Sequence, residues 1–485
     1  MKTRFGFLLS LPLLLSASHA ALAAATPEEA ARLTTLFQSY LGAEPGVVKV
    51  EVDGDGYTAT LDIAPLAAKS ATAGVTFSLT PVELSLSDEG EGKWNVSQEG
   101  PMNFGMKADN KLSVDAKIES YKWEGVFDEK LGTFSESFAE ITNVSVAETI
   151  TDLTQGKTDV NVSIKSMKIE QTATANATGG ADMTAKYVLE TMSETIITGG
   201  SPESGVPALN LVMTAANGTY DTTATGMKAK SVFDLVAFFV SHTSEELIKK
   251  DQVALKTLLA SALPIFENVA GSGTFNTISI ATPMGPVGAD SMTFGADING
   301  VVKEGKLRES ISMSGLSVPP AIVPPWATTL VPKNIAFDFS VSGFDLAAPA
   351  QLILAALDLT KTDPLPSGFE TTLLPALLPS GNVNITLNPT SISNDLYYVN
   401  AEGSMTAGPA ALPSGKATIT ANGLDEVLKV IQAAPPEAGV QSGVAMIIGA
   451  KGMAKAAADG TLSWDIESSG DAKVLVNGID VSKMQ

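Results

Sequence analysis

Histidine is the side chain best suited to proton transfer near neutral pH, and the chain has two of them. His19 lies in the N-terminal leader described below, so His242 would be the only histidine of a mature enzyme. No serine lies in the G-x-S-x-G pattern that presents a hydrolase nucleophile. His242 follows an apolar helical stripe, and Thr243 and Glu246 after it have the spacing of a capping box. We therefore predict that His242 binds a terminal helix carbonyl and has no catalytic role.

Acidic residues are numerous enough to suggest a cation site or a carboxylate enzyme. The segment Asp53, Gly54, Asp55 and Gly56 superficially resembles a calcium loop. An EF-hand loop, however, needs five or six spaced oxygen ligands, a terminal glutamate and flanking helices, whereas strand patterns flank this segment. A hairpin turn is the better interpretation. The acidic runs at 88–91 and 245–246 are predicted to be solvated. Carboxylate pairs for glycoside hydrolysis stay open, but no spacing singles one out. We predict no catalytic, cofactor-binding or metal-binding residue.

The composition limits the classes of partner. The 485 residues include 53 acidic and 31 basic ones, for a net charge of −22. Nucleic acid is therefore not an expected partner, and attraction to an anionic membrane is disfavoured. Cysteine is absent, so disulfides and thiolate chemistry are excluded. Neither phosphate-binding glycine motif opens a helix, so nucleotide binding has no support.

The first residues have the pattern of a secretory signal. Lys2 and Arg4 precede a short apolar stretch at 5–17, and Ala21 and Ala23 form an A-x-A cleavage site. The stretch is shorter than the roughly 20 apolar residues that span a bilayer. We predict a signal peptide over 1–23, a mature chain that begins at Ala24, and a periplasmic location with no membrane span after cleavage. An uncleaved membrane anchor is the alternative.

The mature chain is predicted to open with a helix and to continue as strands. Thr26, Pro27 and Glu29 form a capping box, an apolar stripe follows, and Gly42 ends the helix. Apolar residues then alternate with polar ones over most of 48–225, which is typical of antiparallel sheet with one solvated face. The alternation slips at Tyr121/Trp123 and at Met167/Ile169, where we expect β-bulges or strand breaks.

Two helical stripes near 230–263 are the best internal boundary. The predicted organisation is a region at 24–265 with the first helix, an antiparallel β region and the helical pair, and a β-rich region with short helices at 266–485. Strand endings with a small polar residue, glycine and an apolar residue recur, and helical stripes follow three of them. We predict positive φ or close backbone approach at these glycines. Their residues are Gly226, Gly315, Gly343, Gly423 and Gly478, with Gly300 as a looser case.

The second half also resembles a bacterial family. The residues that carry the resemblance run from Val331 to Phe337, from Ser342 to Asp345, from Thr418 to Asp425, and from Asp459 to Leu462. They are similar to the family called domain of unknown function 2125, mostly secreted or membrane-anchored alphaproteobacterial proteins. The resemblance implies an envelope location and a β-rich fold, and it supplies no catalytic residues. A weaker likeness is to long β-sheet envelope proteins implicated in lipid traffic.

Together these observations predict a β-rich α+β fold with large antiparallel sheets and helices packed on one face. We expect a non-enzymatic periplasmic protein that binds a lipid or another apolar ligand between sheet and helices, with a lipid or an envelope protein as partner. A structural scaffold and a carboxylate-dependent hydrolase are the alternatives. An open apolar groove of at least about 300 Å³ would favour ligand binding over the scaffold.

Overall fold

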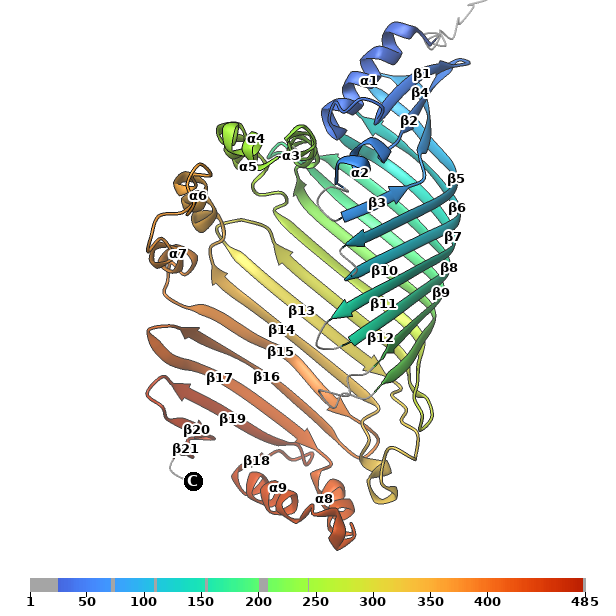
Figure 1. The fold of residues 1–485 in the computed structure, drawn as a ribbon. Coiled ribbons are helices and arrows are strands. Elements are labelled where there is room, and N and C mark those ends of the chain that lie inside the picture. Colours follow the sequence, from blue (N-terminus) through green and yellow to red (C-terminus); the bar gives the residue numbers. More distant parts are fainter. Residues whose placement is uncertain are drawn as a thin grey trace, which may run out of the picture.

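The fold is one large antiparallel sheet with helices along its ends (Figure 1). The computed structural model describes residues 25–70, 75–108, 111–152, 156–199, 208–242 and 244–482. The predicted signal peptide and Ala24 lie outside these residues. The β-rich α+β class is confirmed, and strand pairing joins all 21 described strands into a single sheet.

The strands of the first half are β1 (Val48–Asp53), β2 (Gly56–Leu61), β3 (Val75–Leu79), β4 (Val82–Gly90), β5 (Lys93–Ala108), β6 (Leu112–Asp128), β7 (Thr133–Asp152), β8 (Gly156–Ala175), β9 (Ala181–Thr198) and β10 (Leu209–Met227). From β5 to β10 these strands are long, with 16 to 20 residues each. Strands of the second half are shorter. They are β11 (Asn268–Ala281), β12 (Val287–Asn299), β13 (Gly305–Ser314), β14 (Asn334–Phe344), β15 (Val383–Ser393), β16 (Tyr398–Gly408), β17 (Ala411–Asn422), β18 (Lys455–Ala456), β19 (Leu462–Ser469), β20 (Val474–Val476) and β21 (Ile479–Asp480).

The helices stand mostly in the connections between strands. They are α1 (Pro27–Leu41), α2 (Ala64–Ser70), α3 (Ala229–Ser241), α4 (Glu245–Lys250), α5 (Gln252–Ala262), α6 (Ala347–Ala356), α7 (Glu370–Leu377), α8 (Leu424–Gln432) and α9 (Gln441–Met453), with 3₁₀ turns η2 (Pro325–Leu330) and η3 (Pro436–Ala438). Helix α1 packs against β1 at the N-terminal edge, whereas α3 to α7 form a row along one end of the strands (Figure 1). Helices α8 and α9 stand at the opposite end.

From β5 to β17 the sheet is a meander, because each strand pairs antiparallel with the next one in the chain. Strand β5 has two partners on one side, β4 along its first half and β3 along its second half. Strand β10 pairs with β11 from Val212 to Thr225, so the sheet continues across the expected boundary at 265. Helices α3 to α5 therefore lie in a connection within one sheet.

A crease crosses seven neighbouring strands, from β6 in the first half to β12 in the second. Asn143 on β7, Thr191 on β9 and Thr277 on β11 have φ of +52°, +44° and +53°, a region that non-glycine residues rarely adopt. The strand pairing skips Asn143 with Lys165, Lys165 with Thr191, Thr191 with Ala216, and Ala216 with Thr277, and the pairs on either side keep the same register. The unusual residues thus lie on one line, and on every second strand.

The crease explains the phase slips of the sequence. Apolar residues occupy the even positions before it on β8, up to Ile164, and the odd positions after it, from Met167. Each strand leaves one residue out of the pairing at the crease, so the alternation shifts by one along every strand while the register between strands is unchanged, and both sets stay on the same face. On β6 the register shifts between Ile118 and Tyr121, opposite Pro101 of β5. The prediction of a bulge is confirmed on β6. On β8 the register with β7 and β9 does not shift, so the slip there is a skipped pair and not a bulge, and neither strand breaks.

The predicted helix ends are confirmed with two corrections. Thr26 caps α1 by accepting the Glu29 amide at 3.2 Å, and the amide of Gly42 closes the last turn. The Glu29 carboxylate does not complete a capping box, because it binds Arg32 instead. Thr243 lies outside the described residues, and Ser244 caps α4 by accepting the Leu247 amide. Serine performs the same capping chemistry one position later.

The glycine endings adopt the expected conformation. Gly226, Gly315, Gly343, Gly423 and Gly478 all have positive φ, between +63° and +86°. The looser case, Gly300, is required for a different reason, since a Cβ there would overlap the carbonyl oxygen of Phe266. The prediction of positive φ or close backbone approach is confirmed at all six.

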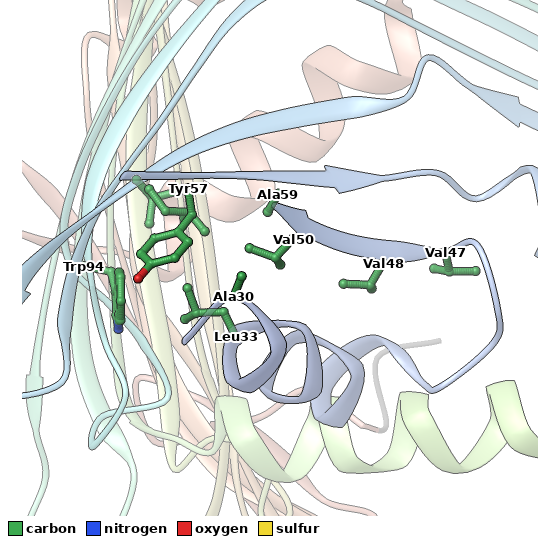
Figure 2. Close-up of a cluster of buried hydrophobic side chains, with 10 residues drawn as sticks. Ala30, Leu33, Val47, Val48, Val50, Tyr57, Ala59 and Trp94 are labelled. Atoms are coloured by element: carbon green, nitrogen blue, oxygen red, sulfur yellow. The ribbon is translucent and has the colours of Figure 1, made fainter. Parts of the chain in front are cut away.

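The best-buried part of the chain lies under α1 (Figure 2). Ala30 and Leu33 of α1 face Val48 and Val50 of β1, with Tyr57 of β2 beside them. Leu33 is only 2% exposed. This cluster fixes the N-terminal edge of the sheet.

Candidate functional site

The most extensive feature of the sheet is a continuous face of apolar side chains. Paired residues on adjacent antiparallel strands share a face, so the register identifies which side chains lie in one row. One row crosses 13 strands and contains Tyr121, Ile141, Met167, Leu189, Gly218, Phe275, Met292, Met313, Ile335, Ile392, Val399, Ala421 and Leu462.

A second row is next to the first and is equally apolar. Its residues are Trp123, Ala139, Ile169, Tyr187, Tyr220, Gly273, Phe294, Ile311 and Phe337. Beyond the crease a third row follows, with Met102, Ile118, Val144, Ile164, Met192, Ala215, Ile278 and Ala289. These three rows are called the apolar face below.

Aromatic rings lie over glycines at the centre of the apolar face. The ring centroids of Tyr220 and Phe294 are 5.4 Å apart and stacked, and those of Phe275 and Phe294 are 5.7 Å apart. Gly273 lies between Tyr220 and Phe294, and a Cβ there would come within 2.7 Å of both rings. A Cβ at Gly218 would similarly meet the ring of Phe275. Because these glycines have no Cβ, the aromatic rings of neighbouring strands pack directly over their backbone. The surface is therefore even as well as apolar.

Much of the apolar face is accessible. Ile311, Phe337 and Ile392 are 40%, 43% and 36% exposed. In the part of the chain that the structure describes, only α1 and its neighbours pack over this side of the sheet, because α3 to α9 stand at the strand ends. Soluble proteins rarely expose a contiguous apolar area of this extent unless it binds something.

A partly open apolar pocket of about 250 Å³, called the N-terminal pocket below, lies at the N-terminal end of the apolar face. Helix α1 forms one wall with Leu36 and Phe37, and Phe134 of β7 forms another. Trp123 of the second row contacts Phe134, with ring centroids 4.6 Å apart, and so links the pocket to the face. The pocket lies between sheet and helix, and it is smaller than the volume of about 300 Å³ that would favour ligand binding.

An open groove of about 310 Å³ lies at the C-terminal end. Its apolar lining includes Leu387, Ala417 and Ile466 of β15, β17 and β19. Leu387 pairs with Phe339, whose ring is 5.6 Å from that of Phe337 in the second row. The apolar face therefore connects the N-terminal pocket with the open groove, and the groove exceeds the volume of about 300 Å³ named above.

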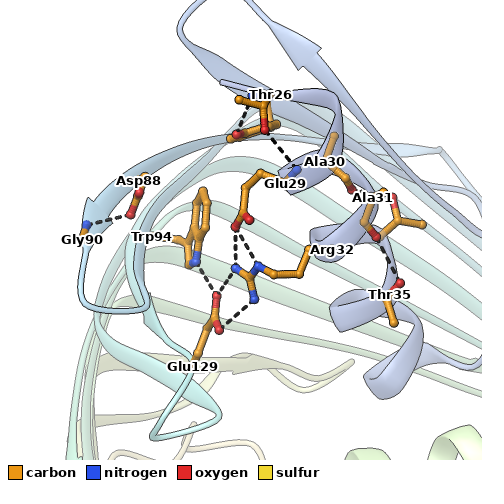
Figure 3. A network of polar contacts seen from close by, with 12 residues as sticks. Thr26, Glu29, Ala30, Ala31, Arg32, Thr35, Asp88, Gly90, Trp94 and Glu129 are labelled. Atoms are coloured by element: carbon orange, nitrogen blue, oxygen red, sulfur yellow. Dashed lines mark hydrogen bonds and ion pairs between the residues drawn. The ribbon is translucent and has the colours of Figure 1, made fainter. Parts of the chain in front are cut away.

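A polar network holds α1 beside the N-terminal pocket (Figure 3). Glu129 accepts hydrogen bonds from Arg32 at 2.6 and 3.1 Å and from the Trp94 indole at 2.7 Å. Partial burial raises the pKa of the Glu129 carboxyl, but the hydrogen bonds from Arg32 and Trp94 outweigh burial, and the pKa lies below its usual value. Hydrogen bonds to Glu129 and Glu29 raise the pKa of Arg32. Both groups stay charged at neutral pH.

The opposite face of the sheet is polar. Lys122 pairs with Glu99 at 3.0 Å and Lys168 with Glu140 at 3.2 Å, on residues that alternate with those of the apolar face. These ion pairs are exposed, so they contribute little stability and keep this face in water. Over β5 to β8 the sheet thus has one polar and one apolar face along these rows.

The residues considered for chemistry have structural roles. The His242 ring binds the Phe238 carbonyl through Nδ1 at 2.7 Å, which is the expected capping contact, and its Nε2 lies 3.0 Å from the Asp251 carboxylate. Asp53 and Gly56 pair across a two-residue hairpin turn. No group of three or more metal-binding side chains occurs within the described residues.

Comparison of the chain with protein-family models, with curated proteins and with solved structures found no significant match in any of the three. The resemblance to the family of unknown function stays a prediction. None of the helices in the described ranges is long and apolar enough to cross a bilayer. The continuity of the apolar face was missed by sequence reasoning, because alternation locates each strand's apolar side but does not show which strands are neighbours.

Proposed function

We propose that the protein binds the acyl chains of lipids along the apolar face. The observation that carries the proposal is the row of 13 paired positions, all apolar, aromatic or glycine, on a side of the sheet that helices largely leave open. With strands about 4.8 Å apart, this row is roughly 55–60 Å long. The hydrocarbon core of a whole bilayer is about 30 Å thick, so several extended acyl chains fit along the row.

An acyl chain matches the face better than other apolar ligands. It is long, flexible and without polar groups, and the three rows contain no charged side chain. A peptide would bring backbone amides and carbonyls that need hydrogen-bond partners, which the interior strands have already used in pairing with each other. A scaffold would have no use for the exposed apolar area. Two facing buried carboxylates would have supported the hydrolase, but Asp345 is the only charged residue among the buried ones in the described chain.

The test compares two charged substitutions on neighbouring strands. Ile311→Glu puts a carboxylate on the apolar face, and because Ile311 is 40% exposed the fold tolerates it. Thr293→Glu is the matched control, since Thr293 precedes Phe294 and lies on the polar face. Titration with a fluorescent fatty acid, and mass spectrometry of organic extracts from the purified protein, measure binding.

We expect Ile311→Glu to bind the fatty acid at least about tenfold more weakly, because a buried charge is costly to desolvate. Thr293→Glu should bind like the wild type. Absence of bound lipid in extracts, together with no fatty-acid binding by the wild type, would leave the scaffold as the better explanation.

We further propose that the protein acts in the periplasm. The support is the signal pattern of the first 23 residues and the absence of cysteine in a chain with a large sheet. N-terminal sequencing of protein from the periplasmic fraction should start at or near Ala24. An intact Met1 end in the membrane fraction would contradict cleavage.

A further inference from the structure

The row of helices along one end of the strands has an unusual surface. This helical rim consists of α3, α4, α5, α6 and α7 along the sheet end (Figure 1). Helices α3, α4 and α6 each pack on α5, and α7 packs on α6. Two hydrogen bonds hold the row together across the chain, from the Lys256 ammonium to the Leu357 carbonyl at 2.8 Å and from the Leu359 amide to the Gln252 side chain at 2.9 Å. These bonds join α5 to the segment that follows α6.

Every helix of the rim exposes a large apolar side chain. Val236 and Phe239 of α3 are 41% and 48% exposed, and Val253 of α5 is 75% exposed. Leu247 of α4, Leu352 of α6 and Leu374 of α7 are between 39% and 46% exposed. Single exposed apolar residues are ordinary, but one on each of five adjoining helices makes an extended apolar edge.

The rim also differs from the rest of the chain in charge. Its five helices contain four lysines and four acidic residues, whereas the whole chain has 31 basic and 53 acidic ones. Acidic surfaces are repelled by anionic lipid headgroups, so a neutral edge on an acidic protein is where a bilayer is approached at least cost. Apolar side chains on short helices enter the boundary between headgroups and acyl chains.

We propose that the helical rim docks on the surface of a lipid bilayer. The sheet would then stand with its strand ends on the membrane, and the apolar face would begin where acyl chains are available. Docking would place the apolar face beside bilayer lipids, which are its proposed ligands. The biological role of docking therefore rests on the proposed function. The two are separable, because fatty-acid binding is measured without a membrane.

The experiment is co-sedimentation of the full chain with phosphatidylcholine vesicles, with and without added phosphatidylglycerol. The rim variant carries Phe239→Asp and Val253→Asp. The matched control carries Met446→Asp and Ile448→Asp on α9 at the opposite end of the strands, where these residues are 75% and 53% exposed. Both variants alter two exposed apolar side chains and add two charges. Fluorescent fatty-acid binding is measured on all three proteins as the check on folding and on the apolar face.

We expect the rim variant to bind vesicles at least about tenfold more weakly than the wild type, with unchanged fatty-acid binding. The α9 variant should bind vesicles like the wild type. Equal sedimentation of all three proteins, equal loss in both variants, or no sedimentation of the wild type would each overturn the docking of the rim. Normal vesicle binding without any fatty-acid binding would instead overturn the proposed function and leave the rim intact.

Discussion

The crease makes a counterintuitive prediction about Thr191. Glycine in the middle of a strand normally costs about 0.5–1 kcal/mol because it loses more backbone freedom on folding. Thr191, however, has φ of +44°, and a left-handed backbone costs an L-residue about 1–2 kcal/mol, with a β-branched residue at the upper end. Thr191→Gly should relieve this strain. The relieved strain exceeds the cost of glycine, so the free energy of unfolding of Thr191→Gly should be about 1 kcal/mol higher than that of the wild type.

The matched control is Thr195→Gly on the same strand. Thr195 pairs regularly with Asn161 and Val212, and its φ is not positive, so glycine there should cost about 1 kcal/mol. The two variants should therefore differ by about 2 kcal/mol, in opposite directions from the wild type. Urea unfolding followed by circular dichroism measures the difference, and unchanged transition slopes show that the same surface unfolds in each. If Thr191→Gly is destabilised as much as Thr195→Gly, the crease is not a site of backbone strain.

Three further outcomes are expected. Gly423→Val should lower the melting temperature more than Gly439→Val. Both glycines have positive φ, but a Cβ at Gly423 would overlap the Leu396 carbonyl, whereas Gly439 has open space around it. Equal melting temperatures would contradict the packing argument. His242→Ala should cost at most about 1–2 kcal/mol in thermal unfolding and leave fatty-acid binding unchanged, whereas a folded variant that fails to bind would contradict the capping role. Because the pKa of Glu129 is lowered in the folded protein, its charge stabilises the fold at pH values above the ordinary carboxyl pKa of about 4.5, and this contribution is lost as the pH falls through the lowered pKa. The unfolding free energy of Glu129→Gln, measured across acid pH, should therefore depend less on pH than that of the wild type. Identical profiles would exclude this contribution.

Local patterns in the sequence were sufficient for the elements and for several turns. The hairpin at Asp53 to Gly56, the end of α1 at Gly42 and the positive φ of Gly423 each depend on a few adjacent residues, and all are confirmed. The phase slip after Ile164 was visible for the same reason. Such features follow from backbone sterics and from the period of two along a strand.

Features that depend on register could not be predicted. The alignment of Asn143, Thr191 and Thr277 into one crease requires knowing which residues face each other across strands. The ion pair between Arg32 and Glu129 joins residues 97 positions apart, and no local pattern relates them. The position of the helices at strand ends was missed as well, because an apolar stripe such as that of α3 shows which side of a helix is buried and not what buries it.

The meander has a consequence for how such a protein is made and altered. Each strand from β6 to β16 is held by its two neighbours in the chain, so the sheet grows at one edge as successive strands emerge and needs no distant segment to arrive first. Adding or removing one hairpin changes the width of the sheet by about 10 Å and leaves the pairing of the other strands as it was. The length of the apolar face is therefore a quantity that evolution, or an engineer, can adjust two strands at a time.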